Sequence, residues 1–215
     1  SCNVKFMSIY NRRGDYRAMN TRTAAEGLTF DMIYDNKAVT NIDIPIHGKH
    51  NVYNILASVA LGYEFGISIE KLQQAVKRVK AIEHRLEIKK FPNFYQIDDA
   101  YNSNPVGSKM AVEVLGMMDG KKIIVTPGMI ELGDKQYEYN MEFGRQIAKV
   151  CDEVILVGEE QTKPILDGLK KEKYNEKNIH ILNDVKDAFP LMRKLSGKST
   201  YVLLENDLPD IFNEK

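Results

Sequence analysis

The second part of the sequence alternates short apolar runs with amphipathic stretches, and this alternation limits the fold more than any other feature. Runs rich in β-branched and aromatic residues occur at 94–99, 121–127, 152–158, 178–182 and 200–205. The segments between them carry apolar residues at helical spacing. Strand and helix repeated in this order predict a parallel sheet with helices on both faces. We therefore expect residues 83–215 to form an α/β domain with a Rossmann-like, doubly wound, mostly parallel sheet. Pro190 should bend or shorten the last helix.

The first 82 residues have a different pattern. Strand-like pieces at 3–10, 28–35 and 42–48 are separated by polar turns, and two amphipathic helices are expected at 51–65 and 69–80. Ser68 can cap the second helix. A few strands and two helices without earlier partners make an incomplete domain, so we expect residues 1–82 to be the C-terminal part of a larger one. The first residue is serine and not methionine, which also suggests a processed or truncated chain.

The charge balance and cysteine usage bound the partners and the compartment. Thirty basic and thirty acidic side chains cancel, so no overall positive field attracts nucleic acid or an anionic membrane. Cys2 and Cys151 are too few for a disulfide framework, which fits a reducing compartment. The sequence contains no apolar run of about 18 residues and no apolar signal core. We expect a folded cytoplasmic protein with neither nucleic acid nor a membrane as partner.

Three common site motifs fail on inspection. GKST at 197–200 lacks the earlier glycine of a P-loop, because Met192 stands there, and it precedes an expected strand instead of following one. No G-x-G-x-x-G dinucleotide fingerprint occurs. His47 and His50 are three residues apart without a further ligand pair nearby, so a loop histidine is the better interpretation than a zinc site.

The sequence IDDAYNSNP (97–105) lies where ligands usually bind, at the carboxyl end of an expected parallel strand. Asn104 is placed to cap the next helix, with Pro105 at its first position. On the simpler interpretation, all the Asx side chains of this segment only cap a helix and support a turn. On the functional one, a carboxylate such as that of Asp99 accepts hydrogen bonds from the two hydroxyls of a ribose.

Two further segments favour a nucleotide. Asn51 and Asn54 lie three apart at a helix start, and a side-chain amide offers the donor and acceptor that adenine requires. Capping by Asn51 is the alternative. Arg85, at the expected domain junction 81–87, has a guanidinium suited to phosphate, although a surface charge or salt bridge is the more ordinary role.

Taken together, four segments in this order and spacing resemble the later part of the Mur ligase family: GKHNVYNILA (48–57), HRLE (84–87), IDDAYNSNP (97–105) and GMIELGD (128–134). The resemblance covers nearly the whole chain. It implies that residues 1–82 are the C-terminal part of the family's central α/β ATP-binding domain, and that residues 83–215 are the Rossmann-like C-terminal ligase domain.

The resemblance also implies roles for individual residues. Asn54, with Asn51 beside it, would contact adenine, Arg85 would reach the ATP phosphates, and Asp99 would hold the ribose. Four more residues would line the cleft near the reacting groups: His50, Tyr101, Asn102 and Asn104. It assigns no catalytic residue and no metal ligand to this chain.

The reaction implied is amide formation in peptidoglycan precursor synthesis. A carboxylate of a UDP-sugar peptide is activated by ATP and Mg²⁺ as an acyl phosphate, and an amine such as D-Ala-D-Ala then attacks it. This chemistry needs a phosphate cradle and magnesium ligands, which we expect N-terminal to this chain. We therefore expect the 215 residues alone to be inactive.

Two departures from the family pattern leave the amine substrate open. Pro127, Gly128 and Met129 stand where the family often has Gly-Asp-Met, and residues 205–210 read ENDLPD where the cell-wall enzymes commonly carry a Lys-Gly-Ser type segment. Carboxylates in place of a cation disfavour an anionic group there. A paralogue with another amine substrate is one alternative. A stand-alone Rossmann-like nucleotide- or partner-binding module without catalysis is another.

Overall fold

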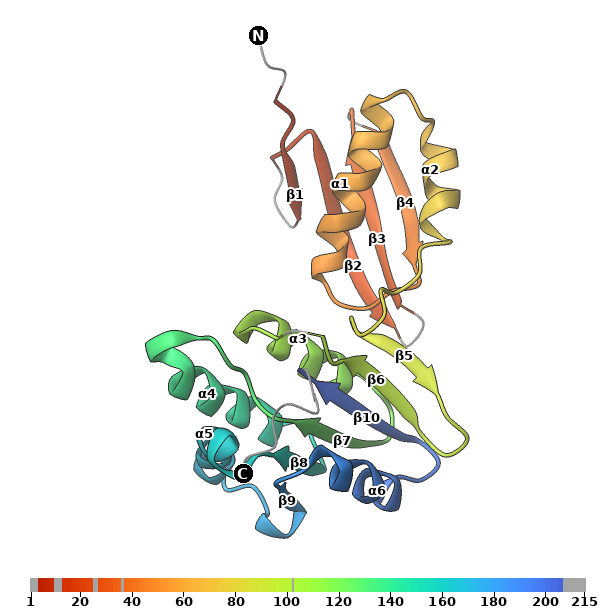
Figure 1. Cartoon of the computed structure of the whole chain (residues 1–215). Helices are drawn as coiled ribbons and strands as arrows, with labels where there is room; N and C mark the ends of the chain where they lie inside the picture. The colour runs from red at the N-terminus through yellow and green to blue at the C-terminus, as the bar shows by residue number, and fades with distance from the viewer. Residues whose placement is uncertain (1–3, 10–12, 25–26, 36, 102, 207–215) are drawn as a thin grey trace. The chain divides into compact units, whose positions relative to one another are not determined.

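The chain folds as two compact units, residues 1–81 and residues 82–215. Figure 1 shows them in a computed structural model that describes residues 4–9, 13–24, 27–35, 37–101 and 103–206. Each unit has its own sheet and its own hydrophobic core. The sequence places a domain boundary between residues 82 and 83, and the compact units divide between Ala81 and Ile82.

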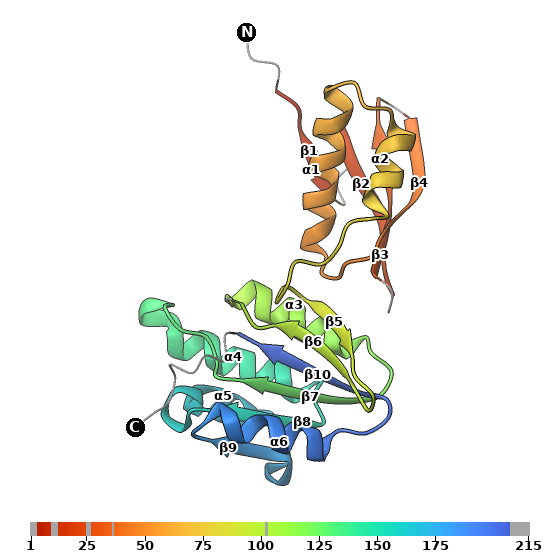
Figure 2. The ribbon, with the colours of Figure 1, turned by 45° about the vertical axis from the view of Figure 1, so that its right-hand side comes forward.

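The first unit is a sheet with two helices on one face (Figures 1 and 2). The strands lie in chain order, with β1 parallel to β2 and the other neighbours antiparallel. The elements are β1 (Met7–Ile9), β2 (Tyr16–Ala24), β3 (Gly27–Tyr34), β4 (Lys37–Ile44), α1 (His50–Glu64) and α2 (Ile69–Val76). The sequence prediction of a polar turn was wrong for β2. Tyr16 and Ala18 are buried between polar neighbours, so this strand shows too few apolar residues to be recognised.

One face of this sheet is apolar and the other is polar. Phe30 and Met32 alternate inward on β3 and pack against Leu56 and Val59 of α1 in a single buried cluster. On the opposite face, Thr29 Oγ1 donates a hydrogen bond to Asp43 Oδ1 (2.9 Å). The pattern is that of a sheet with one covered face, and it confirms the predicted apolar stripe of α1.

The second helix of this unit is shorter than predicted. It ends at Val76, whereas the apolar spacing suggests a helix to residue 80. Ser68 occupies the N-cap position with extended backbone, but its side chain makes no capping hydrogen bond. The predicted cap is therefore correct in position and wrong in its contact.

The second unit contains a six-stranded sheet in the order β5-β6-β10-β7-β8-β9. All neighbouring pairs are parallel except β5 with β6, which is antiparallel. Its strands are β5 (Glu87–Lys90), β6 (Tyr95–Asp99), β7 (Lys121–Thr126), β8 (Glu153–Val157), β9 (Ile179–Leu182) and β10 (Thr200–Glu205). Its α-helices are α3 (Pro105–Gly116), α4 (Gln136–Ala148), α5 (Glu159–Lys171) and α6 (Val185–Leu195). The Rossmann-like prediction is confirmed. The edge strand β5 was not predicted, because its sequence is mostly charged.

Helices cover both faces of this sheet, as expected. Ile124 and Leu203 face the cluster formed by α3, α4 and α5, while Ile123 and Val202 face α6 on the other side (Figure 2). Pro190 lies inside α6 without ending it, since the helix runs on to Leu195. Of the two predicted effects of Pro190, the shortening of the helix was therefore wrong, and the bend stays a prediction.

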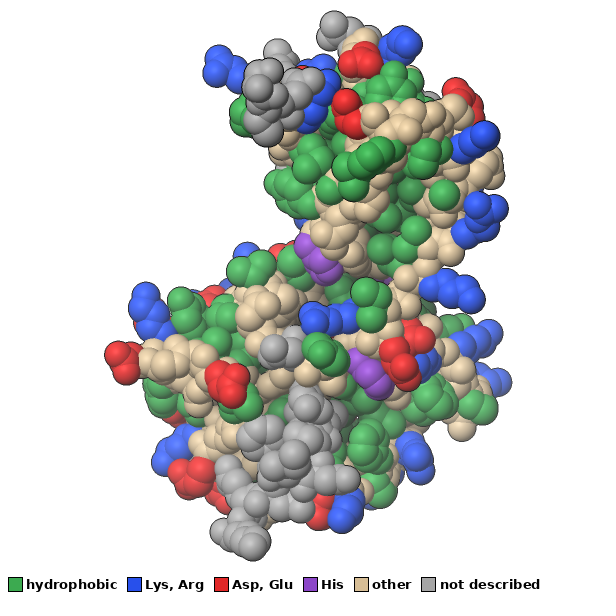
Figure 3. Space-filling model, turned by 45° about the horizontal axis from the view of Figure 1, so that its top comes forward, with side chains coloured by type: hydrophobic (Ala, Val, Ile, Leu, Met, Phe, Trp, Pro, Cys, Tyr) green, Lys and Arg blue, Asp and Glu red, His purple; other side chains and the backbone are tan. Residues whose placement is uncertain are grey.

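The surface carries mixed charges. Figure 3 shows Lys and Arg side chains interspersed with Asp and Glu side chains on the face in view, with no large region of one sign. No helix in the described ranges is long and apolar enough to cross a membrane.

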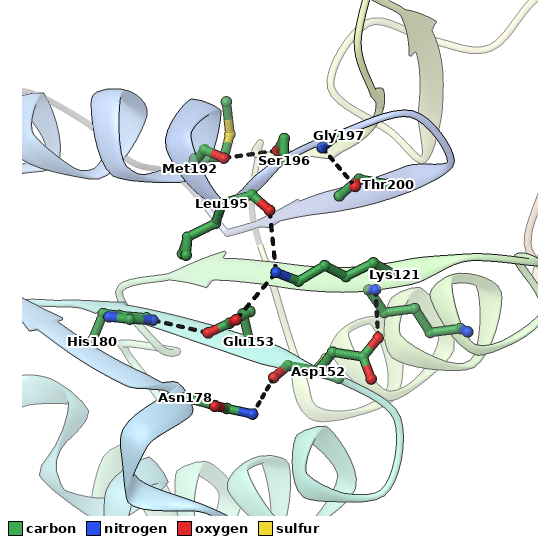
Figure 4. A network of polar contacts seen from close by, with 12 residues as sticks. Lys121, Asp152, Glu153, Asn178, His180, Met192, Leu195, Ser196, Gly197 and Thr200 are labelled. Atoms are coloured by element: carbon green, nitrogen blue, oxygen red, sulfur yellow. Dashed lines mark hydrogen bonds and ion pairs between the residues drawn. The ribbon is translucent and has the colours of Figure 1, made fainter.

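At the amino ends of the parallel strands, a polar network ties three of them together (Figure 4). Lys121 Nζ donates to Glu153 Oε1 and to the Leu195 carbonyl, both at 3.1 Å. His180 Nε2 lies 2.9 Å from Glu153 Oε2. Burial alone would raise the pKa of Glu153, but His180 and Lys121 outweigh it and lower that pKa below its usual value. This end of the sheet is stabilised by contacts within the unit.

Candidate functional site

At the opposite end of the same sheet, the carboxyl ends of three parallel strands lie together. β10 lies between β6 and β7, so the segments that follow these strands meet at one place. Asp99 ends β6, Glu205 ends β10, and the two residues are register partners. This end of the sheet therefore combines two carboxyl groups with residues 100–101, 103–104 and 127–129.

Asp99 is partly buried and held from two sides. Its Oδ1 accepts a hydrogen bond from the Leu86 backbone N–H (3.0 Å), and Glu205 is its register partner on β10. Burial raises the pKa of Asp99 to about 6, and the charge of Asp98 adds to this. The Leu86 N–H, the neighbouring Glu205 as a hydrogen-bonding group, and the charge of Arg85 act on this pKa in the other direction. The pKa of Asp99 therefore lies above the usual value of an aspartate, chiefly because of burial.

Glu205 is fully buried beside it. The hydroxyl of Ser103 donates a hydrogen bond to Glu205 Oε1. Burial, and then the charge of Asp99, raise the pKa of Glu205 well above its usual value. The two carboxyl groups therefore share a proton at neutral pH, because two buried adjacent charges of one sign are costly.

Asn206 joins the segments that follow β6 and β7. Its side chain donates to the Gly128 carbonyl (2.6 Å) and accepts from the Ser103 N–H (3.1 Å). Its backbone N–H donates to the Asp99 carbonyl (3.2 Å). The adjoining segment is held in turn by Asn140, whose side chain accepts from the Met129 N–H and donates to the Met129 carbonyl, both at 2.8 Å. The buried side-chain amides of Asn206 and Asn140 therefore fix the backbone at the carboxyl end of these strands.

Sequence reasoning noted Glu205 and Asn206 only as a departure from a pattern, and it missed Ser103 and Asn140. One signal was available: a glutamate that directly follows the apolar run of a central strand must end up buried or at the sheet edge. The role of Asn140 carries no such signal, because it depends on a contact between a helix and a segment that follows a strand.

Arg85 and Tyr101 lie together near the carboxyl end of β6. The Arg85 guanidinium carbon is 4.6 Å from the centroid of the Tyr101 ring, a cation–π contact. Both side chains are exposed, and Arg85 also acts electrostatically on Asp99. Arg85 and Asp99, both predicted from the sequence as site residues, thus lie near each other.

The simpler interpretation of IDDAYNSNP holds in part. Asn104 Oδ1 accepts hydrogen bonds from the N–H groups of Val106 (3.1 Å) and Gly107 (3.0 Å), with Pro105 at the first helical position. Asp98 Oδ1 accepts from the Ala100 N–H (3.4 Å), as in a turn, but Asp98 also binds Lys89 Nζ (2.8 Å) and His84 Nδ1 (3.0 Å). Asn102 lies outside the described residues. The segment is therefore more than a helix cap, since each aspartate has its own set of partners.

In the first unit, the predicted asparagines form a connected pair at the start of α1. Asn51 Nδ2 donates to the His47 carbonyl (2.6 Å), and Asn54 Nδ2 donates to Asn51 Oδ1 (3.0 Å). The N-cap position belongs to Lys49, so the capping alternative for Asn51 was wrong. Asn54 is exposed and keeps its carbonyl oxygen and a second N–H for a ligand. His50 begins the helix and is exposed, and His47 is buried.

The described residues fit part of a nucleotide and do not locate a metal. Asp99 offers an acceptor for hydroxyl groups, and Asn54 offers an amide for a base edge. The described ranges contain no cluster of three or more His, Cys, Asp or Glu side chains that could hold a metal ion.

Comparison with protein families gives two matches in the order of the two units. The sequence profile of the Mur ligase middle domain matches residues 1–62. The profile described as Mur ligase, glutamate ligase domain matches residues 84–205.

Curated relatives include two proteins named UDP-N-acetylmuramoyl-tripeptide--D-alanyl-D-alanine ligase. The one from Bacillus subtilis (strain 168) is 34% identical over 152 residues, which are 69% of this chain and 32% of that protein. The one from Buchnera aphidicola subsp. Acyrthosiphon pisum is 30% identical over 190 residues, which are 83% of this chain and 42% of that protein. The chain thus spans about a third to two fifths of the length of these relatives.

Solved structures share the fold. A MurF structure from Acinetobacter baumannii has a TM-score of 0.79 and 23% identity, over 94% of this chain and 44% of that one. The MurF ligase of Thermotoga maritima in complex with ADP has a TM-score of 0.72 and 19% identity, over 91% of this chain and 44% of that one.

Proposed function

Because this chain belongs to the Mur ligase family, we propose that it is the later part of an ATP-dependent amide ligase of peptidoglycan precursor synthesis. The observation that carries the proposal is the pair of profile matches, middle domain followed by ligase domain, on a chain whose two units divide between the two matches. In this proposal, residues 1–82 complete a central ATP-binding domain, and residues 83–215 form the ligase domain. ATP is supported as cosubstrate because one of the similar solved proteins was crystallised with ADP.

The proposed roles of the site residues follow from their contacts. Asp99 accepts hydrogen bonds from the ribose hydroxyls, since its carboxylate is fixed by the Leu86 N–H. Arg85 neutralises phosphate charge, and Asn54, supported by Asn51, contacts the adenine edge. Four further residues are proposed to contact the substrates: His50, Tyr101, Asn102 and Asn104.

The proposed chemistry consumes one ATP per amide bond. A substrate carboxylate attacks the γ-phosphorus of ATP, which forms an acyl phosphate and releases ADP. The amine then attacks the acyl carbon, loses a proton and displaces inorganic phosphate. Magnesium would offset the charge on the phosphates, and we place its ligands and the phosphate cradle N-terminal to this chain. The 215 residues alone are therefore proposed to be inactive, and the whole protein is proposed to work in the cytoplasm.

The proposed substrates are a UDP-sugar peptide and an amine, of which D-alanyl-D-alanine is the first to test. It is the amine that the names of the two curated relatives give. A second candidate is a family member that takes another amine, because Glu205 stands where the cell-wall enzymes commonly carry a cation. Neither candidate involves nucleic acid or a membrane.

The test is an assay of the full-length protein with ATP, Mg²⁺, UDP-N-acetylmuramoyl-tripeptide and a panel of amines that includes D-alanyl-D-alanine. We expect phosphate release that requires both the sugar peptide and one amine, with the amide product identified by mass. Asp99→Asn should raise the KM for ATP by about tenfold, the value of one lost hydrogen bond to a charged group.

Asp167→Asn is the matched control, because Asp167 is an acidic residue of the same unit that bonds Tyr137 on the surface. It should leave the KM for ATP unchanged. Tight ATP binding without any amide product would instead favour the stand-alone nucleotide-binding module.

A further inference from the structure

The carboxyl groups of Asp99 and Glu205 form a pair at the carboxyl ends of two central strands. The two residues are register partners at the last positions of β6 and β10. Partners on adjacent parallel strands point their side chains to the same face, which brings these two carboxyl groups side by side. The pair comes from segments more than a hundred residues apart, so only the completed sheet forms it.

The hydrogen-bond pattern assigns the shared proton to Glu205. Glu205 is fully buried, and its Oε1 accepts from the Ser103 hydroxyl. Its Oε2 has no donor among the described residues. Asp99 is less buried and already accepts the Leu86 N–H, which favours its charged form. A protonated Glu205 that donates to Asp99 satisfies the otherwise unpaired oxygen and removes the repulsion between two adjacent charges.

We propose that Glu205 is a positioning residue, whose carboxylic acid donates a hydrogen bond to Asp99 and holds that carboxylate in the orientation that accepts the ribose hydroxyls of the nucleotide. This inference rests on the proposed function. Ser103 supports it by fixing the opposite oxygen of Glu205, so that the acid oxygen faces Asp99. The nucleotide then meets a carboxylate whose rotamer is set by two donors, one from the backbone and one from Glu205.

Within the described part of the chain, two charged groups act on Asp99 besides Glu205. Arg85 and Asp98 act on Asp99 with opposite signs, and Asp99 is the charge that acts on Glu205. Asp98 is itself paired with Lys89 and contacts the His84 ring. The protonation of the pair therefore depends mainly on its burial and on the bond between its two members.

Two variants of equal side-chain length separate the donor from the packing. Glu205→Gln keeps a donor toward Asp99 and an acceptor for Ser103. Glu205→Met fills the same space without a donor, and a buried apolar side chain is compatible with folding. The measurement is ADP affinity of the full-length protein by calorimetry from pH 5.5 to 8.5. Glu153→Gln, at the other end of the same sheet, controls for the loss of one glutamate.

In the wild type, ADP affinity should rise with pH through about 6, the pKa of Asp99, and then level off. Glu205→Gln should bind within about threefold of the wild type. Glu205→Met should bind about tenfold more weakly at pH 7.5, and its profile should shift to higher pH because Asp99 loses a donor. Glu153→Gln should follow the wild-type profile.

The outcomes separate the two proposals. If the wild type binds ADP and Asp99→Asn does not, but Glu205→Met binds like the wild type at every pH, then the positioning role is overturned and the proposed function stands. An equal loss in Glu205→Gln and Glu205→Met also overturns it, because the donor would then be irrelevant. If the wild type does not bind ADP at all, both proposals fail.

Discussion

The ammonium of Lys89 lies 2.8 Å from the carboxylate of Asp98, and this ion pair joins the edge strand β5 to its neighbour β6. Asp98 is buried, and His84 lies 3.0 Å from the same oxygen. Burial alone would raise the pKa of Asp98, but Lys89 and His84 outweigh it, so the pKa falls below its usual value.

Asp98→Asn should therefore destabilise the chain by about 1–3 kcal/mol at pH 7, the range for hydrogen bonds to a charged group. A lowered pKa contributes stability above the unfolded-state value, near 3.9, that is lost as the pH falls through the folded-state pKa. The difference between wild type and variant should thus shrink below about pH 4, as followed by urea unfolding of the 215-residue chain. Glu113→Gln breaks only an exposed pair with Lys109 and should cost less than about 0.5 kcal/mol. Equal effects of the two substitutions would contradict the importance of the Asp98 contacts.

Three glycines allow crowding to be separated from backbone strain. Gly128 has φ +80°, and an added Cβ would lie 2.9 Å from Asn140 Oδ1 and 3.1 Å from Ile165 Cδ1. Gly133 has φ +58° with open space, and Gly197 has open space without a positive φ.

Substitution by alanine should therefore cost about 2–3 kcal/mol at Gly128, about 1 kcal/mol at Gly133, and nothing at Gly197. The midpoint of chemical unfolding gives the order. A Gly128→Ala chain as stable as Gly133→Ala would mean that the segment 127–129 adjusts freely.

The hydrogen bond between Asn54 and Asn51 should affect which nucleotide base the protein selects. Either Asn54→Ala or Asn51→Ala should weaken ADP binding to the full-length protein by about tenfold and reduce the preference for ADP over GDP. The double variant should bind little worse than either single one, because Asn51 acts by holding Asn54. Ser58→Ala, one turn further along the same helix, removes only a bond to the Asn54 carbonyl and should bind normally. Strictly additive losses would show that the two amides act separately.

The buried Glu205 should change stability with pH in the direction opposite to that expected for Asp98. The folded state raises the pKa of Glu205 well above its usual value, so folded Glu205 keeps a proton that the unfolded chain releases above about pH 4.3. Stability from this group therefore falls as the pH rises, by up to about 1.4 kcal/mol per pH unit.

Glu205→Met should consequently gain stability relative to the wild type between pH 5 and pH 8 in thermal unfolding. Glu153, whose pKa is lowered, gives the contrast: Glu153→Gln should lose stability relative to the wild type above about pH 4.5. A Glu205→Met chain whose relative stability does not change with pH would mean that Glu205 is ionised when folded.

Much of the second unit could be predicted because its strands are buried on both faces. Runs such as 121–127 and 200–205 are continuously apolar, and the helices between them show a single apolar stripe. The missed strands β2 and β5 carry few apolar residues, and each pairs with the next strand along the chain, so their own side chains do not mark them as strands. Pro190 lies in the middle of α6, and the helix runs on past it because a proline removes only one backbone hydrogen bond, which the rest of the helix tolerates here.

The candidate site was predictable in its local part. Asp99 and Asn104 stand at a strand end and a helix start, positions that short sequence patterns mark. Glu205, Ser103 and Asn140 act through contacts between segments that only the sheet order brings together, and strand order is not written in local spacing. The links between Asn206 and Gly128, and between Glu205 and Asp99, therefore required the structure.

The place of β10 between β6 and β7 also has a consequence for biosynthesis. This strand follows the other five of its sheet in the sequence, yet it occupies the middle. While the ribosome is still making residues before 200, β6 and β7 have no neighbour between them and expose unpaired edges. Closure of the sheet must wait for the strand that also delivers Glu205 and Asn206. A nascent chain that stalls before this point would therefore be a client for chaperones and would bind no nucleotide through Asp99.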